Sequence, residues 1–235
     1  TYDFGDAKKS AVEAYVFAKA DRSINSALGA QGGASKMYVP GVRVSTNLLD
    51  SLYTSLEYAH QMGTRPNVTT TFKDDVSANA AQFIAVYQLP VAEKYTPVLS
   101  YDYTYTSGEK KGTTNDKTNW SPFYEDQNGG KIHNVLFTQS NSHVQCLALQ
   151  VNPMEDVTTK LSWTNLRLDK DVSTGALTTG NKALGNEIDF NVKYAYTEDV
   201  TIGANLGWFI PGKAYEKPEK SQVASQAIIN VNVNF

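Results

Sequence analysis

The chain has 235 residues, enough for one large β domain or two smaller ones with a sizeable core. Apolar residues make up 41% and aromatic residues 11%, yet the mean hydropathy is −0.39, a composition that suits strands and interfaces. The net charge of −3 is spread along the sequence, which excludes a basic nucleic-acid-binding patch, and the absence of about 18 consecutive apolar residues excludes a membrane-spanning helix.

The first ten residues, TYDFGDAKKS, resemble a strand end at Tyr2 and Phe4 followed by a tight turn at Gly5 and Asp6. We therefore expect at least one strand before the first complete one. From there, apolar and polar side chains alternate with a period of two in about ten segments of roughly 9 to 14 residues. These segments lie at roughly residues 9–20, 36–47, 52–63, 77–90, 95–107, 142–152, 157–168, 186–197, 200–211 and 225–235.

Segment length and loop order favour a transmembrane sheet over a soluble sandwich. A strand of a globular protein runs about five or six residues, whereas a tilted strand that crosses a bilayer takes about 9–11. Short connections (NLLDS, VAEK, PMED and ED) alternate with long ones (21–35, 64–76, 108–141, 169–185 and 212–224). Outer-membrane barrels show this asymmetry, with short periplasmic turns and long external loops. The sequence therefore predicts an all-β, antiparallel, transmembrane up-and-down β-barrel of about ten strands, an even number that could close by itself, as a single domain over 1–235.

The C-terminal segment, IINVNVNF, shows the alternation most plainly. From Ile229 on, its odd-numbered side chains are apolar and its even-numbered ones are asparagines up to Asn234, so one face meets hydrocarbon and the other a watery lumen. The terminal aromatic, Phe235, resembles the signature by which Gram-negative barrels are recognised for assembly. We expect the barrel-assembly machinery to recognise Phe235.

Sorting the segments by face predicts two sets of residues. The predicted pore lining comprises Glu13, Lys19, Arg43, Glu57, Asp102, Lys160, Glu187, Asp189, Lys193, Asn230 and Asn232. The predicted lipid-facing or interface set, which would contact membrane lipid and lipopolysaccharide, comprises Tyr101, Tyr103, Tyr105, Ile188, Phe190, Val192, Leu206, Trp208, Val231 and Phe235. The lining charges are mixed and slightly acidic; they would set a transverse field across the pore or, equally, form internal ion pairs worth about 0–1 kcal/mol each.

No constellation of residues predicts catalysis, a cofactor or a metal. The three histidines do not converge, the single cysteine Cys146 cannot form an intramolecular disulfide, and adjacent Ser142 and His143 of QSNSHV should point to opposite faces of a strand. EDQNGG at 125–130 has oxygen ligands but not the spacing of a known calcium loop. The long external loop 108–141 could fold into the mouth and constrict the lumen, or stay outside it.

Several segments resemble the alginate-export family of Gram-negative outer-membrane porins. They are YTSGEKKGT, WSPFYED and NSHV, followed by VNPMEDVTTKLSW, LGNEIDFNVKYAYTEDVTIGANLGWFIPG and the terminal NVNF, covering roughly residues 80–235. Family members resemble eighteen-stranded barrels, so the resemblance implies a smaller relative or the C-terminal part of a larger barrel. It also implies a channel, but the mixed lining gives a polyanion such as alginate no net attraction.

These observations predict a channel of the bacterial outer membrane, reached through the periplasm, for diffusion or export of small hydrophilic solutes or a polar product. The main alternative is a non-conducting outer-membrane barrel that serves as a scaffold or binds another protein chain. A soluble β-sandwich binding module is a third reading, because period-two alternation also occurs in sandwiches.

Overall fold

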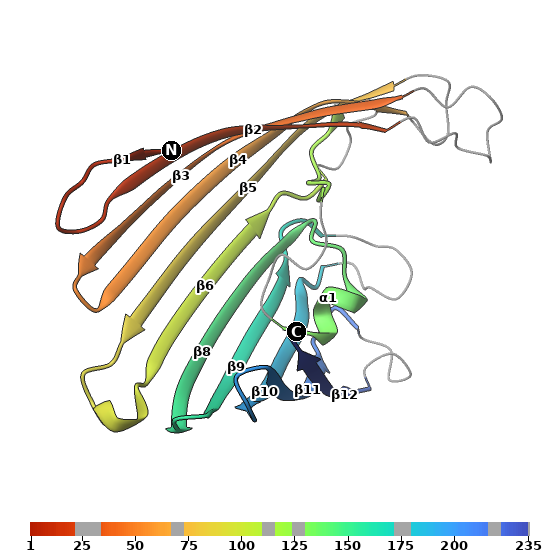
Figure 1. Ribbon diagram of the computed structural model, residues 1–235. Helices are drawn as coiled ribbons and strands as arrows, with labels where there is room; N and C mark the ends of the chain where they lie inside the picture. Colours follow the sequence, from red (N-terminus) through yellow and green to blue (C-terminus); the bar gives the residue numbers. More distant parts are fainter. Residues whose placement is uncertain are drawn as a thin grey trace.

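The computed structural model describes residues 1–21, 34–66, 73–109, 116–123, 130–171, 180–215 and 222–234, which form one curved antiparallel sheet (Figure 1). Its strands follow the chain in order from β1 to β12, with β7 apart from this path as a short parallel partner of β5. The strands are β1 (Tyr2–Asp3), β2 (Ala11–Asp21), β3 (Ser35–Leu49), β4 (Leu52–Pro66), β5 (Lys73–Gln88), β6 (Val98–Thr106), β7 (Asp116–Lys117), β8 (Ser142–Met154), β9 (Val157–Leu168), β10 (Ala183–Ala195), β11 (Val200–Pro211) and β12 (Ala224–Val233).

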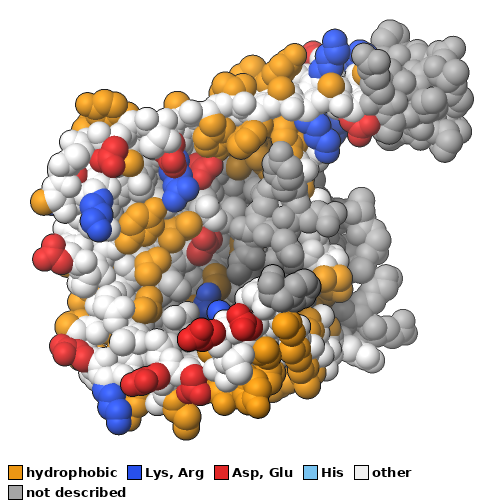
Figure 2. All heavy atoms as spheres, in the orientation of Figure 1, with side chains coloured by type: hydrophobic (Ala, Val, Ile, Leu, Met, Phe, Trp, Pro, Cys, Tyr) orange, Lys and Arg blue, Asp and Glu red, His pale blue; other side chains and the backbone are white. Residues whose placement is uncertain are grey.

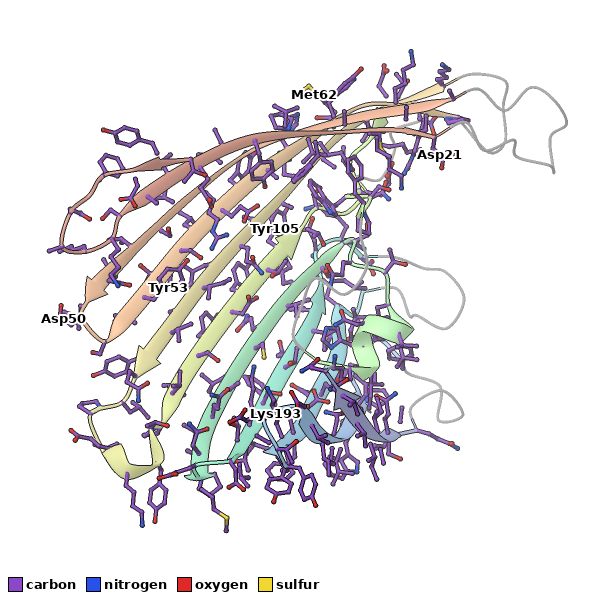
Figure 3. All side chains as sticks on the ribbon, viewed as in Figure 1. Asp21, Asp50, Tyr53, Met62, Tyr105 and Lys193 are labelled. Carbon is purple, nitrogen blue, oxygen red and sulfur yellow. The ribbon has the colours of Figure 1, made fainter. Side chains whose placement is uncertain are left out.

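All ten predicted segments are strands, and the predicted up-and-down antiparallel order is confirmed. The ten long strands run from 9 residues in β6 to 16 in β5, well beyond the length usual in globular proteins. β6 begins at Val98 instead of near residue 95, because Glu93–Tyr95 form a single 3₁₀ turn flanked by left-handed Ala92 and Thr96. The short connections gather at one end of the sheet, where Asp50 lies, and Asp21 marks the other (Figure 3).

Two details of the connections differ from expectation. β4 continues to Pro66 and β5 starts at Lys73, so the connection predicted at 64–76 is only residues 67–72, none of which the structure describes. The predicted strand end is present as the two-residue β1, in which Tyr2 pairs with Val12 of β2 across a turn. Within that turn the Phe4 N–H donates to the Ser10 carbonyl oxygen at 3.0 Å. The Asp6 carboxylate accepts the Ser10 N–H at 2.7 Å.

The sheet curls into an open wall with a concave and a convex side. Within the described residues β12 does not pair with β1 or β2, so the predicted closure into a barrel is not observed (Figure 1). The short helix α1 (Ile132–Leu136), which sequence periodicity did not predict, lies on the concave side. No helix in the described ranges has the length and apolar character needed to span a bilayer.

The buried apolar residues lie where the concave wall is covered by parts of the connection between β6 and β8. One cluster, which includes Ile132, Val144 and Leu166, lies beneath α1. The other joins Trp120 to the small side chains Ala59 and Ala78 and to Val39. Within the described ranges the sheet therefore has no second layer of strands, and its core is formed by loop residues that pack on its inner face.

Candidate functional site: the concave face

The strand registers place all eleven predicted pore-lining residues on one face of the sheet. Paired residues of antiparallel strands project to the same side of the sheet. The registers Glu13↔Arg43 and Arg43↔Glu57 therefore place these three residues on one face across β2, β3 and β4. Further registers carry the same side of the sheet through β5, β6, β8 and β9 to Glu187 of β10. Figure 2 shows charged side chains on the wall of the hollow that this face encloses.

The opposite, convex face carries the predicted lipid-facing residues, except Phe235, which lies outside the described residues. Side chains here are large, apolar and exposed: Leu161 is 53% exposed and Val231 60%. Met62 projects from this outer side of the sheet (Figure 3). A large exposed apolar surface indicates an interaction with lipid or protein, because soluble monomers seldom expose more than a few hundred Å² of contiguous apolar area.

Near β2, β3 and β4 the charges of the concave face pair with one another and with tyrosines. Arg43 Nη1 lies 3.6 Å from Glu13 Oε2, and Arg43 Nη2 donates to the Tyr53 hydroxyl at 3.1 Å. The Tyr15 hydroxyl donates to Glu57 Oε1. Both partners of the Arg43–Glu13 ion pair are more than a third exposed, so this pair contributes at most about 1 kcal/mol to stability.

At the centre of the face, Gln82 of β5 and Asp102 of β6 form a polar group with Thr104. Gln82 Nε2 donates to Asp102 Oδ2 at 3.0 Å and to Thr104 Oγ1 at 3.2 Å. The Thr104 hydroxyl donates in turn to Asp102 Oδ1 at 3.1 Å. The Asp102 carboxylate is thus held by two donors, and the Gln82 carbonyl oxygen is turned away from it.

Glu187 of β10 holds α1 against the wall. Its Oε1 accepts the backbone N–H groups of Lys131 and Ile132, both at 2.7 Å, and its Oε2 accepts the N–H of His133 at 2.8 Å. The His133 ring Nδ1 lies 2.7 Å from the same Oε2, and Glu187 is fully buried. A carboxylate that accepts the free N–H groups of a first helical turn stabilises both the charge and the helix.

Asp189, two residues along the same face, is also buried, at 1% exposure. Among the residues that the structure describes, neither of its carboxylate oxygens has a hydrogen-bond partner, and its Oδ1 lies over Gly207. A Cβ at Gly207 would lie 2.8 Å from that oxygen, so a larger residue there would displace the carboxylate.

Gln61 of β4, fully buried, holds a second part of the loop. Its Nε2 donates to the Ser121 carbonyl at 2.8 Å, and its Oε1 accepts the Ser121 N–H at 2.9 Å. Arg65 donates to Asn119 Oδ1 at 3.0 Å, and the Trp120 N–H donates to the Ser107 carbonyl at 2.9 Å. Segments 118–123 and 130–137 of the 108–141 connection therefore contact the wall on its concave side.

Between segment 118–123 and the wall lies a cavity of about 350 Å³. Among its lining residues are Tyr15, Phe17, Glu57, Gln82, Trp120 and Phe123. The site also contains residues that the sequence pattern did not predict: Tyr15, Gln61, Gln82, Trp120 and Phe123. The signals that could have found them are the polar-face positions of Tyr15, Gln61 and Gln82 within their strands and the aromatic residues of WSPFYED.

At the end of the strands next to the long connections, Asp169 joins three segments of the chain. Its Oδ2 accepts the Gly108 N–H at 2.8 Å, and its Oδ1 lies 3.2 Å from Lys170 Nζ and 3.7 Å from His143 Nε2. Burial by itself raises the pKa of Asp169, but the Gly108 N–H and the Lys170 ammonium outweigh it, so the pKa lies below its ordinary value.

Ser142 and His143 project to opposite faces, as predicted. The Ser142 hydroxyl bonds Thr106 at 3.0 Å on the concave side, while His143 Nδ1 lies 2.7 Å from the Tyr103 hydroxyl on the convex side. Each histidine has its own contacts: Asn79 for His60, Glu187 for His133, and Tyr103 with Asp169 for His143. In the described ranges no three His, Cys, Asp or Glu side chains gather as metal ligands, and most of EDQNGG lies outside them.

The sequence of this chain matches a family model that agrees with the resemblance noted in the C-terminal strands. Among solved structures, the NanC porin aligns with 98% of this chain and 96% of its own, at a TM-score of 0.45 and 11% identity. No curated protein matches. The sequence model of the family described as alginate export matches residues 2–228, nearly the whole length and well beyond the region in which the resemblance was first noted. This chain belongs to the alginate export family.

Proposed function

We propose that this chain forms the wall of a water-filled channel in the bacterial outer membrane, through which small hydrophilic solutes diffuse or a polar product leaves the cell. Membership of the alginate export family supports an outer-membrane, porin-like channel and suggests a non-enzymatic role. The up-and-down antiparallel sheet is the architecture that such channels use.

The observation that carries the proposal is the two-sidedness of the sheet over its ten long strands. Ionised and amide side chains share the concave face, and exposed apolar side chains share the convex face. In water the convex face would be costly to expose, whereas lipid would cover it. A concave wall that carries charges and amides would conversely be costly in hydrocarbon, so it faces water.

The described parts of loop 108–141 narrow the proposed channel. Gln61 holds segment 118–123 and Glu187 holds segment 130–137, both on the concave side. In this proposal these two contacts set the width of the pore. The five acids and four bases of the predicted lining make the pore weakly selective between small ions of opposite charge, because a strongly selective pore presents a ring of one sign.

Conductance in planar bilayers, combined with cysteine labelling, tests the proposal. In a Cys146→Ser background, Lys160→Cys places a thiol on the concave face of β9 and Leu161→Cys places one on the adjacent convex position. We expect ohmic current steps in both variants. A bulky hydrophilic thiol reagent should reduce the current of Lys160→Cys and leave that of Leu161→Cys unchanged.

Two results would contradict the channel. One is a folded, membrane-inserted protein that carries no current and co-purifies with another chain, which would favour the scaffold alternative. The other is a protein that stays soluble without detergent and does not migrate differently on gels after heating, which would favour a soluble module.

A further inference from the structure

The cavity beneath segment 118–123 is built from small residues below and aromatic rings at its sides. Ala59 and Ala80 line its floor, and Gly41 lies under the Tyr15 ring, where a Cβ would clash. The rings of Tyr15 and Phe17 lie 4.9 Å apart. The volume of about 350 Å³ falls in the range of about 300–1,000 Å³ found for small-molecule sites.

Beside the aromatic rings, the cavity presents hydrogen-bonding groups. Glu57 uses one carboxylate oxygen to accept the Tyr15 hydroxyl, which leaves the second as an acceptor. Because the Gln82 amide nitrogen faces Asp102 and Thr104, its carbonyl oxygen is directed elsewhere. The cavity thus offers apolar ring faces to one side of a ligand and polar atoms to its edge. A sugar ring has this pattern, with C–H groups on its faces and hydroxyls around its edge.

The charges at the cavity oppose an anionic ligand. Among the described residues that line it, Glu57 is the only charged one. Asp102 accepts a hydrogen bond from Gln82 and is not part of the lining. The nearest guanidinium, that of Arg43, is occupied by Glu13 and Tyr53. Lys19 lies over the Phe123 ring, 5.7 Å from its centroid, at the aromatic edge of the cavity. A carboxylate on the ligand would meet the Glu57 carboxylate, and the described cations nearby, Arg43 and Lys19, already contact Glu13 and the Phe123 ring.

We infer that this cavity is a binding site for an uncharged sugar ring on the inner wall of the proposed channel. The inference rests on the proposed function, since a channel brings solutes to the concave face. It also gives the channel a substrate class that differs in charge from a polyuronate. The aromatic rings pack on the ring face, and the oxygens of Glu57 and Gln82 accept sugar hydroxyls.

Tryptophan fluorescence tests the site directly, because Trp120 lines the cavity while Trp163 and Trp208 lie on the convex face. With Trp163→Phe and Trp208→Phe, the emission of the detergent-solubilised protein reports on Trp120 alone. We expect a saturable change in emission on titration with the neutral disaccharides cellobiose or maltose. Digalacturonate, which carries two carboxylates, should require at least tenfold higher concentration for the same change.

Two substitutions separate the proposed contacts. Gln82→Leu should weaken binding of the neutral disaccharide at least fivefold, and the matched Gln145→Leu, on the convex face of β8, should leave it unchanged. Glu57→Gln should bring the affinity for digalacturonate closer to that for the neutral disaccharides, because the carboxylate that repels it is removed. Calorimetry on the unsubstituted protein compares the affinities for the neutral disaccharides and for digalacturonate without any variant.

The inference is overturned if neither disaccharide binds saturably, or if digalacturonate binds as tightly as both. Its failure is distinct from failure of the channel. Current without sugar binding would contradict the sugar site and support the channel. Sugar binding in a protein that carries no current would support the sugar site and contradict the channel.

Discussion

His133 and Glu187 are joined by two hydrogen bonds although 54 residues separate them in the sequence. The backbone N–H and the ring Nδ1 of His133 both approach Glu187 Oε2, at 2.8 and 2.7 Å. Because Lys131 and Ile132 donate to the other oxygen, one fully buried carboxylate holds the first turn of α1 on the concave wall. This contact, together with that between Gln61 and Ser121, holds the described segments 118–123 and 130–137 on the concave wall.

Replacing Glu187 with glutamine should release α1 from the wall. The amide keeps one acceptor oxygen but turns an NH₂ group toward backbone N–H donors, so we expect a loss of about 1.5–3 kcal/mol of unfolding free energy. Hydrogen exchange of residues 130–136 should also accelerate. Glu13→Gln on the same face is the control, and its exposed ion pair should contribute only about 0–1 kcal/mol. Equal effects of the two substitutions would contradict the anchoring role.

Gln61→Leu should detach segment 118–123. Leucine fills a similar volume but leaves the N–H and carbonyl of Ser121 unpaired, at a cost of about 1–3 kcal/mol for each buried group. In the background that retains only Trp120, tryptophan emission should shift to longer wavelength as the indole becomes hydrated. Gln145→Leu on the convex face should not shift it, and unchanged emission in Gln61→Leu would show that the loop stays in place by other contacts.

An arginine on the convex face should be costly in lipid. Leu161 is 53% exposed near the middle of β9, and Leu161→Arg should destabilise the membrane-inserted protein by about 2–4 kcal/mol if it lies near the bilayer centre. Thr158→Arg, on the concave face of the same strand, should change stability by about 0.5 kcal/mol or less. Reversible folding into lipid vesicles measures both, and a tolerated Leu161→Arg would argue against contact with lipid.

Asp169 should make stability depend on pH at the ends of β8 and β9. The pKa of Asp169 is lower in the folded protein than in the unfolded chain. Its contribution to the unfolding free energy is therefore present above the ordinary pKa near 3.8, and it is lost as the pH falls through the pKa of the folded state. Between pH 5 and the acid limit of folding, roughly pH 2–3, Asp169→Asn should show a shallower decline in unfolding free energy. A decline of the same slope in both proteins would mean that Asp169 is not held by Gly108 and Lys170.

The strands could be predicted because their pattern is local. Alternation in EIDFNVKYAY or VTIGANLGWFI assigns each side chain to a face without knowledge of any partner, since successive residues of a strand point to opposite sides. The registers accordingly place Glu187 and Asp189 on one face with Lys193, and Ile188 with Phe190 on the other. Strand ends were less predictable, because β4 and β5 extend beyond their alternating cores.

The cavity and the loop contacts could not be predicted, because they depend on residues far apart in the sequence. Gln61 is an ordinary polar position of a strand until Ser121, sixty residues later, packs against it. Helix α1 is a single turn, too short to produce a periodic signal, and it is stabilised by a carboxylate from β10.

By itself, the sequence determined that this protein is a wall of long antiparallel strands with one apolar and one polar side. The alternation of side chains follows from the geometry of a single strand. It therefore does not depend on which residues of the neighbouring strand pair with it. Only the tertiary structure decided that segments 118–123 and 130–137 of the 108–141 connection pack on the polar side, the first of them over a cavity. The physical reason is that burying Glu187 and Gln61 requires hydrogen-bond partners, and the folded loop supplies them.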